Sequence, residues 1–411
     1  MERHTRGEFL ATIGKGTLGM VGLSALGGIF TAMDDTVVGA SASTLNVGLL
    51  TSITGVFQGF GVFMSGGAHV AVEEINRRGG ILGRKINLII ADDQSGGAAG
   101  ATQARRLLFQ DNVDVLIGTV NSDTTLSVLP LVKQAGKTFI YPVDGDDRTC
   151  TPNHHTNPLA FGLGDTPFQR QGRFISYAVK HFGKHWYLLG NDYVFPHSEL
   201  AVTKQYLKRA GGTVVAEEYT PLGTTDYLPI VRRIQGSKAQ VVFAVVPGTD
   251  GDAFIKASRV SGLFQHKTIT GVATFAAEVY PGMAGFANGI ITVDRYTELI
   301  DNPVNKRFVR AYKKRFHPRY PIGPSAALTY SAFLILEAAA KKARSLDGPK
   351  VRKAMEGLSI LLPIGPAQVG ADHLLKQHEY VLRIENNQYH IVKDLGLTTS
   401  PDHEGCTVKS L

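Results

Sequence analysis

The chain has 411 residues, of which 43% are hydrophobic and 19% charged, and its formal net charge is +8. At roughly 100 to 200 residues per domain, this length predicts two or more domains of ordinary globular composition. The lysines and arginines are spread along the chain instead of gathered in one patch, so the charge indicates a solvated basic surface and argues against a nucleic-acid-binding protein.

Residues 1–42 are predicted to be a signal peptide. Arg3 and Arg6 precede a run of apolar and small residues, and Ala40-Ser41-Ala42 has the small-x-small pattern after which signal peptidase cleaves. An uncleaved anchor is the alternative, but Lys15 interrupts a run that is already near the lower limit of about 20 residues for a membrane span. We expect export with cleavage after Ala42. Gly7 stands where a twin-arginine leader has its second arginine, so the export route stays open between Sec and Tat.

The mature chain opens with a β-α-β unit at residues 45–93. An apolar strand at 45–50 runs into a Ser/Thr/Gly turn and then a helix, which Gly79-Gly80 ends because glycine takes the left-handed C-cap conformation at least cost. A second short strand at 86–91 ends at Asp92-Asp93. This unit predicts a parallel sheet with a polar turn at the carboxyl end of its first strand, where open α/β sheets bind ligands.

Strands and helices continue to alternate after this unit. Further strands are predicted at 113–118, 138–142, 185–190, 213–219, 241–246 and 268–271, and helices at 103–110, 125–135, 168–182, 197–210, 227–235 and 250–261. The pattern runs in two like series, the second starting near residue 161. We therefore expect an α/β fold with two doubly wound lobes.

The sequence carries no recognisable catalytic pattern. The G-x-S-x-G elbow is absent, since Phe63 stands two places before Ser65, and so is the phosphate loop G-x-x-x-x-G-K-[ST]. His181 and His185 are four residues apart but lack the Glu of a zinc-protease motif. We predict a binding protein with neither metal nor cofactor, and not an enzyme.

Several motifs occur in one order along the chain: Glu74-Ile75-Asn76, GGILGR at 79–84, Asp92-Asp93, Tyr141-Pro142-Val143, GNDYVFP at 190–196 and EYTPLG at 218–223. These motifs and their order resemble those of the periplasmic type I solute-binding proteins, which serve ABC transporters for branched-chain amino acids, urea and short-chain amides. The last three motifs are similar to urea- and short-chain-amide-binding members. The resemblance covers nearly everything after the leader.

The resemblance implies two lobes joined by a hinge of three crossings, near residues 161, 292 and 359. The first lobe would hold residues 43–160 and 293–358, including an apolar helix at 326–343, and the second would hold 161–292 and 359–411. It also implies a periplasmic location and an ABC permease of the inner membrane as partner. In that oxidising compartment Cys150 and Cys406 could form a disulfide.

Polar turns at strand ends are the candidate binding site, at residues 52–61, 119–125 and 141–147 of the first lobe and at 191–195 and 247–250 of the second. The candidate ligand-binding residues are Phe60, Val120, Ser122, Tyr141, Val143, Asp144, Tyr193, Phe195, Gly248 and Asp250. Ser122 matches a serine of the amide-binding relatives and could hold a carbonyl or carboxylate oxygen, with helix capping as the alternative role. Val120 stands where those relatives carry an aromatic residue.

The other candidates rest on similar matches. Phe60 corresponds to an aromatic position of amino-acid-binding relatives and is otherwise a core residue, whereas Tyr141, Tyr193 and Phe195 match pocket positions of amide-binding members. The two acids, Asp144 and Asp250, favour a neutral amide or a cationic group over a dicarboxylate.

We therefore expect an exported solute-binding protein that closes on urea or a short-chain amide. A branched-chain or other amino acid is the alternative ligand. A cytoplasmic amide-sensing regulator is an alternative of another class, which cleavage of the leader would exclude. An amidase, which would release ammonia from the ligand, is a third.

Overall fold

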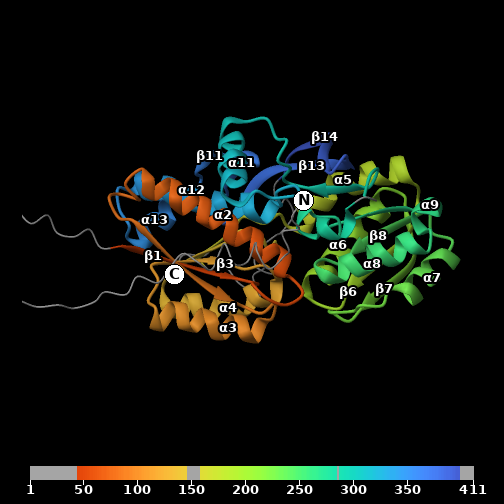
Figure 1. The fold of residues 1–411 in the computed structure, drawn as a ribbon, viewed down its shortest axis with the longest axis horizontal. Helices are drawn as coiled ribbons and strands as arrows, with labels where there is room; N and C mark the ends of the chain where they lie inside the picture. Colours follow the sequence, from red (N-terminus) through yellow and green to blue (C-terminus); the bar gives the residue numbers. More distant parts are fainter. Residues whose placement is uncertain (1–43, 146–157, 285–286, 399–411) are drawn as a thin grey trace, which may run out of the picture. The chain divides into compact units, whose positions relative to one another are not determined.

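The computed structural model describes residues 44–145, 158–284 and 287–398 (Figure 1). Ser43–Leu411 is one compact unit, and everything below concerns this unit. The predicted signal peptide and both cysteines lie outside the described residues. No helix in the described ranges has the length and apolar character needed to cross a membrane.

The first sheet is parallel, with strand order β2-β1-β3-β4-β5. Its strands are β1 (Leu45–Thr51), β2 (Ile86–Asp92), β3 (Val115–Gly118), β4 (Thr138–Tyr141) and β5 (Ala160–Gly162). All residues of β3 and β4 are buried, as expected of a parallel sheet that is covered on both faces. The strand ends that carry the predicted turns therefore lie along one edge of this sheet.

Helices cover both faces of the first sheet (Figure 1). They are α2 (Gln58–Arg77), α3 (Gly97–Arg105) with the π-helical turn η1 (Arg106–Gln110), α4 (Ser122–Ala135), α12 (Pro324–Ala343) and α13 (Gly348–Met355), while α11 (Pro303–Phe316) packs on the outside of α2. The pair α2 and α12 lies on one face and the pair α3 and α4 on the other. Hydrogen bonds from Tyr330 to Glu74 and from Arg78 to Glu337 join α12 to α2, so the late segment of the chain returns to the first sheet.

The packing of α2 on α12 depends on Gly67. A Cβ atom at this position would lie 2.1 Å from the carbonyl oxygen of Ala326, which is backbone and cannot rotate away. We expect Gly67→Ala to lower the free energy of unfolding by about 1–3 kcal/mol, the usual range for overpacking, in a denaturation experiment. Gly236→Ala, at a helical position with nothing within 4 Å, is the matched control and should not destabilise the protein.

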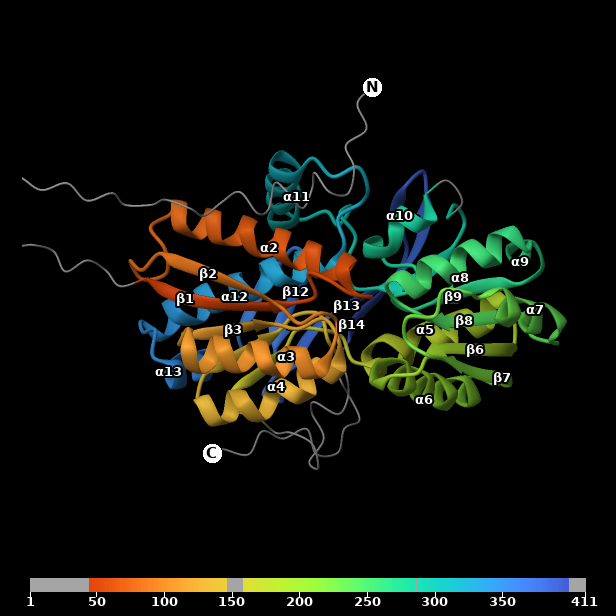
Figure 2. The same ribbon diagram turned by 60° about the horizontal axis from the view of Figure 1, so that its bottom comes forward.

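The second sheet is also parallel, with order β7-β6-β8-β9. Its strands are β6 (His185–Asn191), β7 (Thr213–Thr220), β8 (Val241–Val245) and β9 (Thr268–Gly271), and its helices are α5 (Pro167–Phe182), α6 (Val194–Arg209), α7 (Leu228–Gly236), α8 (Thr249–Val260) and α9 (Leu263–His266). The helices α5 and α6 cover one face, and α7 and α8 the other (Figure 2). The α/β prediction with two parallel sheets is confirmed. The predicted start of α6 at residue 197 is wrong, because Val194, Phe195 and Pro196 already form its first turn.

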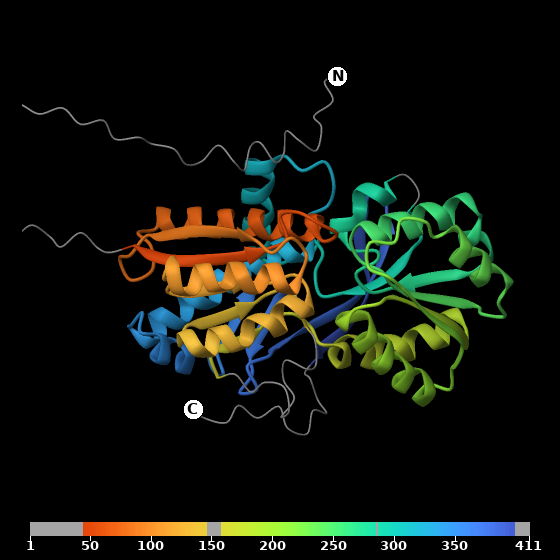
Figure 3. The same cartoon turned by 90° about the horizontal axis from the view of Figure 1, so that it is seen from below.

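A third sheet, which the sequence analysis did not predict, is mostly antiparallel. It contains β10 (Ile291–Asp294), β11 (Ser359–Leu362), β12 (Gly365–Val369), β13 (Leu375–Glu385) and β14 (Gln388–Thr398). The long ribbon of β13 and β14, drawn in blue, passes between the two parallel sheets (Figure 3). Its turn is Asn386-Asn387, both with positive φ, which is the requirement of a two-residue type I′ hairpin.

The chain passes between the parallel sheets at three places. These are the segment from β5 to α5, the end of β10 before α11, and β13. The Thr270 hydroxyl of β9 donates to the carbonyl of Ile291, and the Thr292 hydroxyl of β10 donates to the carbonyl of Gly271, so β10 lies beside the second sheet. Further along the chain, Asn302 Nδ2 donates to the carbonyl of Leu362 at the end of β11. The lobe boundaries at residues 160/161, 292/293 and 358/359 remain a prediction.

Short helices, η3 (Ala277–Val279) and α10 (Tyr280–Met283), lie between β9 and β10. Glu278 of η3 is buried, and its carboxylate accepts the backbone N–H of Ser325 in the first turn of α12, 2.8 Å away. Carboxylates are stabilised at helix N-termini because the first N–H groups have no partner within the helix. Glu278 thereby holds the segment after β9 against the start of α12.

Candidate ligand-binding site

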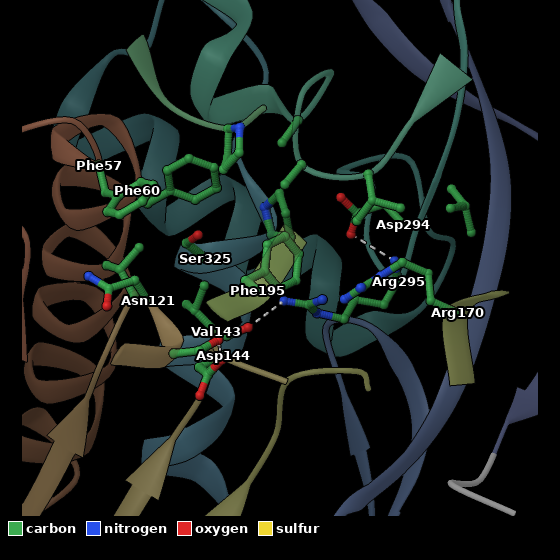
Figure 4. Close-up of a pocket in the computed structure, with 18 of the residues that line it drawn as sticks. Phe57, Phe60, Asn121, Val143, Asp144, Arg170, Phe195, Asp294, Arg295 and Ser325 are labelled. Carbon is green, nitrogen blue, oxygen red and sulfur yellow. Dashed lines mark hydrogen bonds between the residues drawn. The ribbon is translucent and has the colours of Figure 1, made fainter. Parts of the chain in front are cut away.

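A cavity of about 70 Å³ lies among the turns that follow strands of both parallel sheets (Figure 4). A volume of roughly 10–15 Å³ on this measure holds one water, so the cavity has room for a small molecule. Seven of the ten predicted ligand-binding residues line it: Phe60, Val120, Ser122, Val143, Asp144, Tyr193 and Phe195.

An aromatic wall forms one side of the cavity. Phe57, which the sequence analysis did not single out, packs edge-on to Phe60 with ring centroids 6.4 Å apart and lies 5.6 Å from the ring of Tyr193. Tyr193 is 6.4 Å from Phe195. Because Phe57 precedes α2 and Tyr193 precedes α6, this wall joins the two lobes. It offers a ligand an apolar surface together with the Tyr193 hydroxyl, whose pKa burial raises well above its usual value.

Polar side chains at the start of α4 form another side. Asn121 is the N-cap of α4, because its Oδ1 accepts the N–H of Thr124 at 2.8 Å. Its Nδ2 is buried and has no acceptor among the described residues, and Asn121 is one of the residues that line the cavity. Ser122 Oγ instead donates to Oδ1 of Asp144 at 2.6 Å. The capping role that was the alternative for Ser122 therefore belongs to Asn121.

The polar lining combines donors with an acceptor. Asp144 is a buried carboxylate that lines the cavity and already accepts Ser122. Ser325, at the start of α12, is buried and lies against Glu278, whose carboxylate accepts its backbone N–H. A ligand can therefore donate to Asp144 while accepting from Asn121 Nδ2.

Two arginines, Arg170 and Arg295, also line the cavity, and the sequence analysis did not name them. Both are almost fully buried, and burial lowers the pKa of Arg295 to about 10, so that it stays charged at neutral pH. Arg170 donates from Nε to Asp165 at 2.6 Å, and Arg295 donates to the carbonyl of Val143 at 3.3 Å. Both guanidinium groups are therefore engaged with the protein.

Three predicted residues do not line the cavity. Tyr141 packs in the core of the first sheet, with its ring centroid 5.5 Å from that of Phe139. Gly248 has φ +71°, and a Cβ there would lie 2.4 Å from the carbonyl oxygen of Val56. That carbonyl accepts the N–H of Thr249 at 3.2 Å, so this position is a backbone contact between the lobes.

Asp250 is the third residue outside the cavity, and it supports a loop. Its Oδ2 accepts Asn191 Nδ2 at 2.7 Å and the backbone N–H groups of Gly223 and Thr224 at 2.9 and 3.1 Å. Burial raises the pKa of Asp250, and these hydrogen bonds oppose that shift. Asp250 therefore orders the turn after β7 behind the site.

A family model described as "Periplasmic binding protein" matches residues 44–388. The chain belongs to this family. The Leu/Ile/Val-binding protein BraC3 of Rhizobium johnstonii is 26% identical over 79% of this chain and 87% of its own length. A leucine-, isoleucine-, valine-, threonine- and alanine-binding protein of Pseudomonas aeruginosa is 23% identical over 79% of this chain and 85% of its own.

Solved structures of the same fold include two solute-binding proteins. One, from an ABC transporter of R. palustris in complex with benzoate, has a TM-score of 0.80 and 22% identity and covers 90% of this chain and 100% of its own. A leucine-binding protein of Thermotoga maritima has a TM-score of 0.76 and 18% identity, covering 85% of this chain and 98% of its own. The predicted type I fold and the resemblance to periplasmic solute-binding proteins are both confirmed.

Proposed function

We propose that this periplasmic binding protein is the exported solute-binding component of an ABC transporter, which closes two lobes on a small polar ligand and delivers it to an inner-membrane permease. The observation that carries the proposal is the cavity, whose walls come from strand-end turns of both parallel sheets. The names of the relatives and of the structural neighbours support a transport role. Binding would close the lobes through the crossing segments, as in other periplasmic binding proteins.

The proposed ligand is urea or a short-chain amide. An amide carries N–H donors and a carbonyl acceptor within a few ångströms of each other, and the residues that line the cavity include the acceptor Asp144 and the donor Asn121 Nδ2. The cavity is small, and its aromatic wall suits the flat, uncharged face of such a molecule.

The charges around the cavity disfavour a ligand such as the benzoate bound by the R. palustris protein. Arg170 and Arg295 already contact carboxylates or a carbonyl, while Asp144 and Asp294 line the cavity as acids. An anion such as benzoate would add a net negative charge, and the two arginines among the described lining residues already have protein partners, so that charge is costly in a buried site.

A branched-chain or other amino acid is the alternative ligand, and the names of the relatives favour it. Its ammonium group would contact Asp144, its carboxylate would lie at the N-terminus of α4, and its side chain would face the aromatic wall. An amide-sensing regulator, the alternative of another class, requires the chain to remain in the cytoplasm. N-terminal sequencing of the protein from a periplasmic extract would exclude it by finding a start at Ser43.

The test is a thermal-shift screen of the chain from Ser43 onward with millimolar urea, acetamide, leucine, valine and benzoate. A ligand that binds only the native state stabilises it by RT ln(1 + [L]/Kd), or about 2.7 kcal/mol at a hundredfold excess over Kd. We expect a higher Tm with urea or acetamide. A shift with leucine or valine alone would make the amino acid the ligand, and a shift with benzoate alone would overturn both.

A further inference from the structure

Six charged side chains on or beside the segments that cross between the lobes form one buried group, which we call the hinge cluster. Its members are Asp165, Arg170, Glu199, Asp294, Arg295 and Glu379. Asp165 follows β5, the pair Asp294 and Arg295 ends β10, and Glu379 lies on β13, so each of the three crossings contributes. Arg170 comes from α5 and Glu199 from α6.

Two carboxylates of the hinge cluster are paired with arginine. Asp165 accepts Arg170 Nε at 2.6 Å and also contacts the guanidinium group of Arg295. Glu199 contacts the guanidinium group of Arg170 and accepts Gln171 Nε2 at 2.6 Å. The two guanidinium groups thus already have carboxylate partners.

The other two carboxylates of the hinge cluster, Asp294 and Glu379, have no arginine left to pair with inside the cluster. Asp294 accepts the backbone N–H of Arg295 at 2.7 Å. Both carboxylate oxygens of Glu379 are buried and lack a hydrogen-bond partner in the described part of the chain. Four acids therefore share two arginines, and ionising all four would leave a buried net negative charge.

Burial is the main cause of the pKa shifts that result. It raises the pKa of Glu379 to about 8, the charge of Asp294 adds to this, and Arg170 and Arg295 oppose it. Burial and the nearby Glu278 of η3 raise the pKa of Asp294 to about 7. Asp144, after β4, is the further acid that faces Arg295.

We propose that the hinge cluster binds a proton and thereby links ligand binding in the cleft to pH. Asp294, Arg170 and Arg295 line the cavity, so a ligand that fills it displaces water from the cluster and makes the uncharged acid more favourable (Figure 4). Opening the crossings would have the opposite effect by admitting water to Glu379. This inference rests on the proposed function, since it concerns regulation of the same cleft.

The sign of the linkage follows from the raised pKa values. An acid whose pKa is raised in the folded state stabilises that state below its ordinary pKa, and this contribution is lost as pH rises through the folded pKa. The Tm of the ligand-free protein should therefore fall as pH rises toward 9. Ligand affinity should fall over pH 7 to 9, with proton uptake on binding.

The first experiment measures Tm against pH without ligand for the wild type, Glu379→Gln and Glu385→Gln. Glu385 is the matched control, because it lies on the same strand but is exposed. We expect Glu379→Gln to raise Tm at pH 8 to 9 and to flatten its pH dependence, while Glu385→Gln follows the wild type. Adding Asp294→Asn should flatten the profile further. Identical profiles for wild type and Glu379→Gln would overturn the proton site.

The second experiment is calorimetric titration with urea, or with leucine if the screen favours it, at pH 7.5 in phosphate and in Tris. The difference in observed enthalpy between these buffers reports proton uptake. We expect uptake by the wild type and less by Glu379→Gln. Tight binding without uptake would overturn the linkage and leave the proposed function standing. Failure of every probe to bind would instead overturn the proposed function, with the proton site still decided by the Tm profiles.

Discussion

Replacing Asp144 with alanine is expected to weaken ligand binding by about 100-fold or more. The carboxylate is a buried acceptor that lines the cavity, and a hydrogen bond to a charged group contributes about 1.5–3 kcal/mol. Loss of 2.7 kcal/mol corresponds to a factor of 100 in Kd. Isothermal titration of the ligand that gives the largest thermal shift measures the effect.

Two further variants make this prediction specific. Asp301→Ala removes an acid whose side chain is 82% exposed and should leave Kd unchanged. Asp144→Asn keeps the shape and one acceptor oxygen but removes the charge, so a cationic amine should lose much more affinity than a neutral amide. Unchanged affinity in Asp144→Ala would contradict the site as described.

Arg170→Met is expected to lower the free energy of unfolding by about 3–5 kcal/mol, the usual cost of removing one partner of a buried ion pair. Arg170 is almost fully buried and contacts both Asp165 and Glu199, so its loss leaves two acids beside a single remaining arginine. Guanidinium chloride denaturation, followed by the fluorescence of Trp186, measures this. Trp186 is the only tryptophan and lies in the core of the second lobe.

The matched control for Arg170 lies on the same helix. Lys180→Met also replaces a cation with an apolar side chain of similar length, but Lys180 is exposed near the end of α5. The free energy of unfolding of the Lys180→Met variant should differ from that of the wild type by less than about 0.5 kcal/mol, as is usual for surface substitutions. Equal stability of the two variants would mean that the buried pairing contributes nothing net.

The spacing of apolar residues and the positions of glycine and polar turns predicted the parallel sheets of the fold. Short apolar runs such as β8, followed by glycine or polar turns and amphipathic helices, specify strands that are buried on both faces. The antiparallel strands β11 to β14 were not predicted, because they pair with one another through short turns and do not follow the strand–helix alternation of the parallel sheets. Asn386-Asn387 was the available local signal, since asparagine tolerates positive φ in a two-residue hairpin turn.

The candidate site was only partly predictable for a related reason. Turns after apolar strands identify where a cavity can form, and Phe57 lay within the predicted 52–61 turn without being distinguished from Phe60. Tyr141 matches a pocket position of amide-binding members, but it still belongs to β4 and packs in the core. Arg170 and Arg295 both line the cavity although they are 125 residues apart in sequence. Only the tertiary fold brings them together, and no local sequence pattern indicates it.

The backbone N–H of Thr249 donates to the carbonyl of Val56, beside Gly248, whose missing Cβ permits the approach. The residues proposed to bind the solute, such as Val120 and Asp144, take no part in it. Substitution of those cavity-lining residues can therefore change the solute that is bound while this backbone hydrogen bond between the lobes is kept. A transporter could acquire a new cargo in this way without redesigning the surface that its permease meets.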